Sequence, residues 1–170
     1  TATYTPAAGS VTQTTWYRAV LITGSGACTS FSTAAKLTVD PTTVGGTISG
    51  PTGVCNGNSV TITLGSQVGS VLRWEYTDNN WSSGSTPISK PTTSITESVT
   101  IASNRTARTF RAVVRSGLCL QQYSADFVLP VNTSVTPGTL SGGRDVCTGS
   151  NSTLLTLSGD RKSTRLNSSH

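Results

Sequence analysis

Four cysteines are the side chains of this chain best suited to form a covalent bond. Cys55 and Cys147 each precede a strand-like apolar segment, whereas Cys28 and Cys119 each follow an Arg-Ala-Val segment. Within the complete repeat defined below, we expect Cys55 and Cys119 to form a disulfide. Closing this loop of about 64 residues would stabilise the fold by roughly 4 kcal/mol. The alternatives are a bridge between Cys28 and Cys55, or four free buried thiols. Paired cysteines would indicate an oxidising compartment, and hence export.

Nucleophilic and acid–base catalysis have little basis in this sequence. The one histidine, His170, lies in an atypical terminal segment described below, so no Ser-His-Asp or Cys-His arrangement is predicted. Glycoside hydrolysis needs two carboxylates facing each other across a cleft. The complete repeat has four scattered carboxylates, Glu75, Asp78, Glu97 and Asp126. We therefore expect no enzymatic activity and no cofactor.

Metal binding is also not predicted. The cysteines lie 27, 64 and 28 residues apart, and no Cys-x-x-Cys pair occurs, so a zinc site is not indicated. The run Asp78-Asn79-Asn80 offers oxygen ligands for calcium, which usually requires six to eight of them. A turn explains the same three residues more simply.

Trp81 and Tyr76 are the candidate binding residues. Trp81 lies in the polar loop Asp78–Ser85, where an exposed indole would stack on a sugar ring or anchor a protein contact. The alternative, which we favour, is that Trp81 folds back over the edge of a sheet and covers the core. A nearby arginine cluster is interpreted mainly as a solvated strand face rather than a patch that contacts an anion or a polysaccharide; it comprises Arg105, Arg108, Arg111 and Arg115.

The segments that position these residues occur twice, about 92 residues apart. Tyr17-Arg18-Ala19-Val20 corresponds to Phe110-Arg111-Ala112-Val113, and the Gly46–Gly50 motif corresponds to Gly138–Gly142. A period of this length is that of a small domain. We assign residues 1–40 to the C-terminal part of one repeat, 41–131 to a complete repeat and 132–159 to the N-terminal part of a third.

Residues 160–170 interrupt the repeat and resemble a translated sequencing adapter, so we predict that this tail is an artefact. Without it, the net charge falls from +5 to +3, which is too weak to indicate nucleic-acid binding. No apolar run approaches the ~20 residues of a membrane span.

The complete repeat consists of short segments with apolar residues at every second position. Val60, Ile62 and Leu64 alternate with threonines, and Phe110, Ala112 and Val114 form a second such series. A third series places Leu72, Trp74 and Tyr76 on one face, with Trp74 in the core. No helical periodicity is present. About seven short antiparallel strands predict an all-β sandwich of two sheets.

Four motifs resemble the tandem immunoglobulin-like repeats of large bacterial surface and secreted proteins. They lie at Gly45–Gly57, Val71–Glu75, Thr109–Val114 and Tyr123–Ala125. The resemblance implies an immunoglobulin-like antiparallel β-sandwich in a tandem array outside the cell or at its surface. It further implies a non-catalytic spacer or adhesive module whose partners are neighbouring repeats, with polysaccharide or a surface protein as further candidates. The alternative is a carbohydrate- or protein-binding module appended to an exported enzyme.

Overall fold

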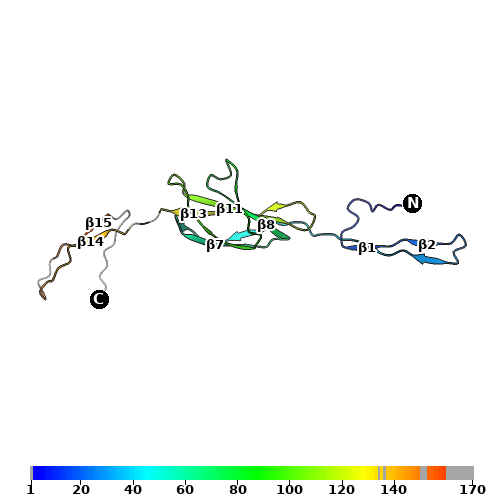
Figure 1. Cartoon of the computed structure of the whole chain (residues 1–170), viewed down its shortest axis with the longest axis horizontal. Helices are drawn as coiled ribbons and strands as arrows, with labels where there is room; N and C mark the ends of the chain where they lie inside the picture. Colours follow the sequence, from blue (N-terminus) through cyan, green and yellow to red (C-terminus); the bar gives the residue numbers. More distant parts are fainter. Residues whose placement is uncertain (1, 134, 136, 150–152, 160–170) are drawn as a thin grey trace.

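The computed structural model describes residues 2–133, 135, 137–149 and 153–159, and all regular structure among them is β (Figure 1). The predicted artefactual tail, residues 160–170, lies outside the described residues. None of the described residues forms a helix that could cross a membrane. The first segment, residues 2–40, has four strands: β1 Thr15–Tyr17, β2 Val20–Ile22, β3 Thr29–Phe31 and β4 Ala35–Leu37.

Two sheets pack together in what we call the central sandwich, residues 44–132. The smaller sheet has the strand order β10-β7-β5, built from Ser94–Ser98, Ser59–Gly65 and Thr47–Ser49. The larger sheet has the order β6-β13-β11-β8-β9, with β12 paired to β11. Its strands are β6 Val54–Cys55, β8 Ser70–Thr77, β9 Thr86–Ile88, β11 Ala107–Arg115, β12 Gln122–Tyr123 and β13 Phe127–Asn132.

The all-β sandwich predicted from the sequence is confirmed, with one exception to antiparallel pairing. Strands β6 and β13 run parallel, and Val131 is opposite Val54. A parallel pair needs a long crossover connection. Here the rest of the sandwich supplies that connection, because β6 lies near the start of the unit and β13 at its end.

The core lies between the two sheets and follows the predicted alternation. Along β7, Val60, Ile62 and Leu64 are buried and their neighbours are exposed. From the larger sheet, Trp74 and Phe110 are completely buried against them. All buried core residues come from positions 60–131. The central sandwich therefore has its own hydrophobic core and needs no apolar residue from the flanking segments.

The predicted inward position of Leu72 is wrong. Leu72 is 36% exposed, whereas Val71 is 6% exposed. Arg73 pairs with Val113 and Val71 pairs with Val114, so the pairing of β8 with β11 passes over Leu72. This β-bulge reverses the faces on one side of it, because an extra residue in one strand shifts the alternation by one.

The segments on either side of the central sandwich form hairpins. In the first segment β1 pairs with β4 and β2 pairs with β3, and in the last described segment β14 Thr139–Ser141 pairs with β15 Thr156–Ser158. Figure 1 shows these hairpins on opposite sides of the sandwich. Their apolar side chains are largely exposed, including Trp16, Ile22 and Leu140.

Candidate functional site

The outer face of the larger sheet holds a stack of one arginine between two aromatic rings. Arg111 points outward because its neighbours Phe110 and Ala112 lie in the core. Its guanidinium carbon is 4.0 Å from the ring centroid of Trp81 and 4.0 Å from that of Tyr123. We call Trp81, Arg111 and Tyr123 the arginine stack. Cation–π contacts of this kind contribute roughly 0.5–2 kcal/mol each, depending on their exposure to water.

Glu75 lies beneath the arginine stack and is only 4% exposed. Its Oε2 accepts hydrogen bonds from Nε and Nη2 of Arg111, at 2.9 and 2.7 Å. Its Oε1 accepts one from Nε of Arg73 at 2.8 Å, and Arg73 Nη2 lies 2.6 Å from the same oxygen. Burial would raise the pKa of Glu75, but the hydrogen bonds and charges of Arg111 and Arg73 outweigh burial and lower it. The carboxylate is therefore held ionised.

The loop that carries Trp81 has an unusual backbone. Asn80 and Trp81 have φ angles of 54° and 62°, in the left-handed region that L-residues seldom adopt. Such residues persist only where their surroundings fix them. The Trp81 indole Nε1–H donates a 2.7 Å hydrogen bond to Asp126 Oδ2, and one face of the ring covers Arg111. Trp81 thus folds back over the sheet, as the sequence interpretation favoured, but it covers Arg111 on the outer face and not the core as expected.

The other candidate binding residue, Tyr76, lies in a different environment. It packs against the core, with its ring centroid 6.2 Å from that of Phe110. The guanidinium of Arg108 lies 4.0 Å from its centroid on the same side of the sheet. Glu75, the preceding residue, contacts the arginine stack on the outer face. The structure therefore does not bring Tyr76 and Trp81 together in one site.

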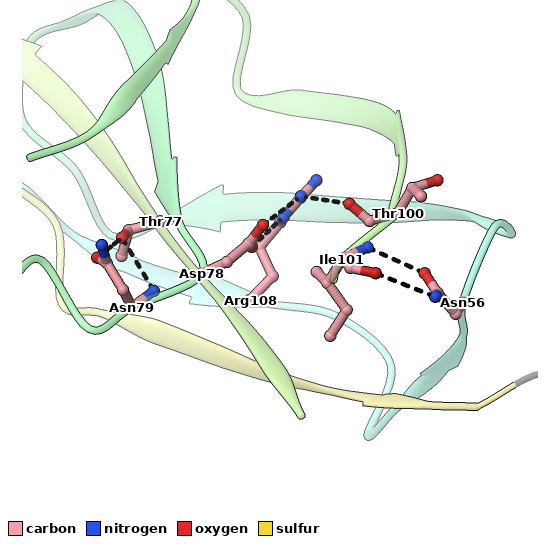
Figure 2. A network of polar contacts seen from close by, with 7 residues as sticks. All are labelled: Asn56, Thr77, Asp78, Asn79, Thr100, Ile101 and Arg108. Atoms are coloured by element: carbon pink, nitrogen blue, oxygen red, sulfur yellow. Dashed lines mark hydrogen bonds and ion pairs between the residues drawn. The ribbon is translucent and has the colours of Figure 1, made fainter. Parts of the chain in front are cut away.

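A second buried ion pair closes the core near β6, and Figure 2 shows its contacts. Arg108 donates from Nε and Nη2 to the two carboxylate oxygens of Asp78, at 2.6 and 2.8 Å, and from Nη2 to the Thr100 carbonyl at 2.8 Å. Beside it, the side-chain amide of Asn56 forms two hydrogen bonds with the backbone of Ile101: its Nδ2 donates to the Ile101 carbonyl, and its Oδ1 accepts from the Ile101 N–H. Asp78, considered above as a turn residue and calcium ligand, thus pairs with the neighbouring strand β11 of its own sheet, and Arg108 links that strand to the loop after β10.

Sequence reasoning did not find either arginine–carboxylate arrangement as a unit. Arg108 and Asp78 are 30 residues apart, and Arg111 and Glu75 are 36 residues apart. The strand registers alone bring them together, because Arg111 is directly opposite Glu75. Among the described residues, no group of three or more His, Cys, Asp or Glu side chains is arranged to hold a metal ion.

The two ends of the central sandwich contact the chain that enters and leaves it. At the entry end, Asp40 Oδ2 accepts a 3.0 Å hydrogen bond from the Leu118 amide, and Ser116 N–H donates to Thr43 Oγ1 at 3.0 Å. A side chain at Gly117 would collide with the Asp40 carboxylate. At the exit end, β6 pairs with the last residues of β13, and the backbone N–H of Asn56 donates to the Asn132 carbonyl at 2.8 Å.

The disulfide predicted between Cys55 and Cys119 is absent, and all four cysteines have free thiols. In the strand register, Cys55 of β6 is opposite Asn132 of β13 at the exit end. The Cys119 thiol lies 3.5 Å from the Pro41 carbonyl at the entry end. The nine residues of β11 separate the two ends. At about 3.3 Å per residue, this is about 30 Å, whereas bonded cysteines have Cα atoms within about 7 Å. The pairing was expected because both cysteines were assigned to one predicted repeat; it is wrong because the strands between them run from one end of the central sandwich to the other.

The alternative bridge between Cys28 and Cys55 is also not formed. Cys28 lies in the turn between β2 and β3, whereas the chain leaves the first segment through β4. That turn is therefore at the end of the hairpin away from the linker into the central sandwich. The alternative of four free buried thiols is right about the free thiols and wrong about burial, because Cys119 is half-buried and the other three cysteines are exposed.

The central sandwich coincides with a known sequence family. Residues 44–133 match the model of a family described as a domain of unknown function (DUF8696). These limits begin just before β5 and end just after β13. No curated protein matches the chain.

Proposed function

The chain belongs to the family described as a domain of unknown function (DUF8696), and we propose that it is a non-catalytic, immunoglobulin-like repeat of a large bacterial surface or secreted protein. In this proposal, the repeat is a structural spacer and adhesive module outside the cell. Its partners are the neighbouring repeats of the same chain. Its contribution is length and resistance to pulling.

One observation carries this proposal: the chain enters the central sandwich at one end and leaves it at the other. Entry is beside Leu118, through the contact of Asp40, and exit is at Asn132, beside β6. Each repeat therefore adds the length of its strands, about 30 Å for a strand such as β11. An arrangement with both connections at one end would add little length.

The pairing of β6 with β13 suits such a load. Tension on the two connections pulls Val54 toward the entry end and Val131 toward the exit end. The two strands are parallel and directly bonded, so this tension shears the pair along its length. The bonds between them must then break together rather than one at a time. The Arg108–Asp78 pair lies near the same end, and Arg108 also donates to the Thr100 carbonyl, which ties β11 to the loop after β10 there.

Force spectroscopy on the full chain, held at its two termini, tests the proposal. We expect one main unfolding event that lengthens the chain by about 280 Å, the extended length of residues 44–132 less their folded length. Val54→Pro removes a strand residue from the sheared pair and should lower the unfolding force by roughly half. Thr139→Pro, in the exposed β14, is the matched control and should leave this event unchanged. Unfolding without measurable resistance would overturn the proposal.

The alternative function, binding of carbohydrate or protein, depends on Trp81. One face of its ring covers Arg111, and its indole N–H is bonded to Asp126. These contacts are why we place the spacer function first. A glycan array provides the comparison: binding that disappears in Trp81→Ala, persists in Trp16→Ala and leaves the circular dichroism unchanged would establish a binding module instead.

A further inference from the structure

We infer that consecutive repeats are joined by a disulfide across their junction. The bond links the early cysteine of one repeat, at the position of Cys55, to the late cysteine of the following repeat, at the position of Cys119. This inference rests on the proposed function, because it requires repeats in tandem. It assigns the cysteines to the joints of the array rather than to the interior of each repeat.

The entry end shows where the late cysteine lies. The Cys119 thiol is 3.8 Å from the Asp40 carbonyl oxygen and 3.5 Å from that of Pro41. The position is fixed on both sides, because the Asp40 carboxylate accepts the Leu118 amide and the Cys119 amide donates to the Ser116 carbonyl at 2.8 Å. The thiol of the following repeat thus lies directly against the linker residue Asp40.

The exit end shows where the early cysteine lies. Cys55 is paired with Asn132 across the parallel β6–β13 pair. Neighbouring strands are about 4.8 Å apart. Cys55 is exposed, so its thiol is not enclosed in the core of its own repeat.

The linker residues of these two ends occupy the same position in the repeat. Asp40 lies eight residues after Ser32 of the Phe31-Ser32 motif, and Asn132 lies eight residues after Ser124 of the Tyr123-Ser124 motif. Where two complete repeats follow one another, a single residue therefore takes both roles. In the strand register it is opposite the early cysteine of the repeat that ends there, and its carbonyl contacts the late cysteine of the repeat that begins there.

Both cysteines also approach this residue from the same side. The Asn132 carbonyl accepts its hydrogen bond from Asn56, the residue after Cys55. The equivalent carbonyl, that of Asp40, faces the Cys119 thiol. The late cysteine and the residue after the early cysteine thus lie at the same carbonyl group of the linker. Bonded cysteines have Cα atoms 4.4–6.8 Å apart, a span similar to the spacing of paired strands.

The bond needs an oxidant, which we take to be a disulfide-containing exchange protein of the exporting compartment. One cysteine thiolate attacks a sulfur of that oxidant's disulfide, forming a mixed disulfide and releasing a thiol. The second cysteine thiolate then displaces the oxidant's remaining sulfur. Two thiols have become one disulfide with loss of two protons, and the oxidant leaves with both electrons as a dithiol.

A chain with two complete repeats tests the inference. It keeps residues 1–132 and continues with a second copy of residues 41–132, since the central sandwich has its own core. The junction variant carries Cys119→Ala in the first copy and Cys55→Ala in the second. It retains Cys28, the early cysteine before the junction and the late cysteine after it. The control variant carries the two substitutions the other way round and retains the cysteines at the outer ends, in a chain of identical composition.

Both variants are oxidised with oxidised glutathione at low concentration, alkylated and analysed by mass spectrometry of non-reduced peptides. In monomers of the junction variant, we expect a cross-linked peptide containing Cys55 and Cys119 and one alkylated thiol, Cys28. The control variant should keep three alkylatable thiols. Three thiols in both variants, or a bond to Cys28, would overturn the inference.

Further measurements keep this result interpretable. Circular dichroism and urea unfolding should be alike in the two reduced variants, and serine in place of alanine repeats the test in a second background. Force spectroscopy on the same chains separates the two proposals. Resistance to pulling without the cross-link would leave the spacer function and remove the disulfide, whereas loss of resistance in both variants would remove the function itself.

Discussion

The hairpin around Arg18 and the hairpin around Arg111 have nearly the same sequence in two different surroundings. In each, an alanine amide donates to a serine hydroxyl, from Ala19 to Ser32 at 2.8 Å and from Ala112 to Ser124 at 2.9 Å. The arginines also lie over equivalent rings. Arg18 is 4.1 Å from the centroid of Phe31, and Arg111 is 4.0 Å from that of Tyr123. The local contacts of the hairpin are thus the same in both places.

Burial distinguishes the two hairpins. Ala112, Val113 and Val114 are completely buried, whereas Val20 and Leu21 are 51% and 59% exposed. The central hairpin has the nine-residue strand β11, while the first has two three-residue strands, β1 and β2. The central copy packs against β8 and the smaller sheet. The comparison shows that hydrogen bonds and ring contacts need only the hairpin, and that the core needs strands distant in sequence.

The largest expected effect comes from replacing one tryptophan in the central sandwich and one in the first segment. Trp74 is completely buried, so Trp74→Ala should lower the free energy of unfolding of the central sandwich by about 3–5 kcal/mol. Trp16 is 64% exposed, so Trp16→Ala should change it by less than about 0.5 kcal/mol. Urea unfolding followed by circular dichroism measures both. Equal losses would mean that the first segment shares the core of the sandwich.

A smaller effect is expected for the two equivalent arginines. Arg111→Ala removes one of the two cations that neutralise the buried Glu75, which should cost about 2–3 kcal/mol. Arg18 lies over Phe31, and among the described residues it forms no ion pair, so Arg18→Ala should leave the central sandwich within about 0.5 kcal/mol. Arg111→Lys keeps the charge but loses the planar stack and should fall between them. A loss in Arg18→Ala as large as in Arg111→Ala would contradict the distinction.

The smallest expected effect is a dependence on pH. The pKa of Glu75 is lowered in the folded state, so its ionisation stabilises the fold fully above the ordinary pKa of about 4.5. This stability decreases as the pH falls from that value through the lowered pKa, because the unfolded chain then binds the proton more readily. Urea unfolding between pH 7 and pH 3 measures the slope. Glu75→Gln should flatten it, and Arg18→Ala should leave it unchanged; an equal slope in wild type and Glu75→Gln would contradict the assignment.

Alternation along single strands was enough to predict much of the fold. Val60, Ile62 and Leu64 are inward as expected, as are Trp74 and Phe110. The period of two is a property of one strand and needs no knowledge of its partners. Leu72 was misassigned because its face depends on a bulge in the pairing of β8 with β11. Nothing in the sequence of β8 alone marks that bulge.

The contacts of the site were less accessible to sequence reasoning. Trp81 folds over the sheet as expected, but onto its outer face and not over the core, because its partners Arg111 and Asp126 lie 30 and 45 residues further along the chain. Tyr76 was grouped with Trp81 because both are aromatic and close in sequence. In the fold, Tyr76 instead packs against Phe110 and under Arg108. Which side chains meet across neighbouring strands depends on the strand register, and a single sequence does not specify that register.

The sequence by itself determined the strand-forming segments, the faces of most of their side chains and the recurrence of several short motifs. These depend on neighbours within a few residues, whose types and order are printed in the chain. The tertiary structure alone decided the ends at which Cys55 and Cys119 lie, and which carboxylate neutralises Arg108 and Arg111. These features depend on strand direction and register across the sheets, because residues far apart in sequence meet only when those strands pair.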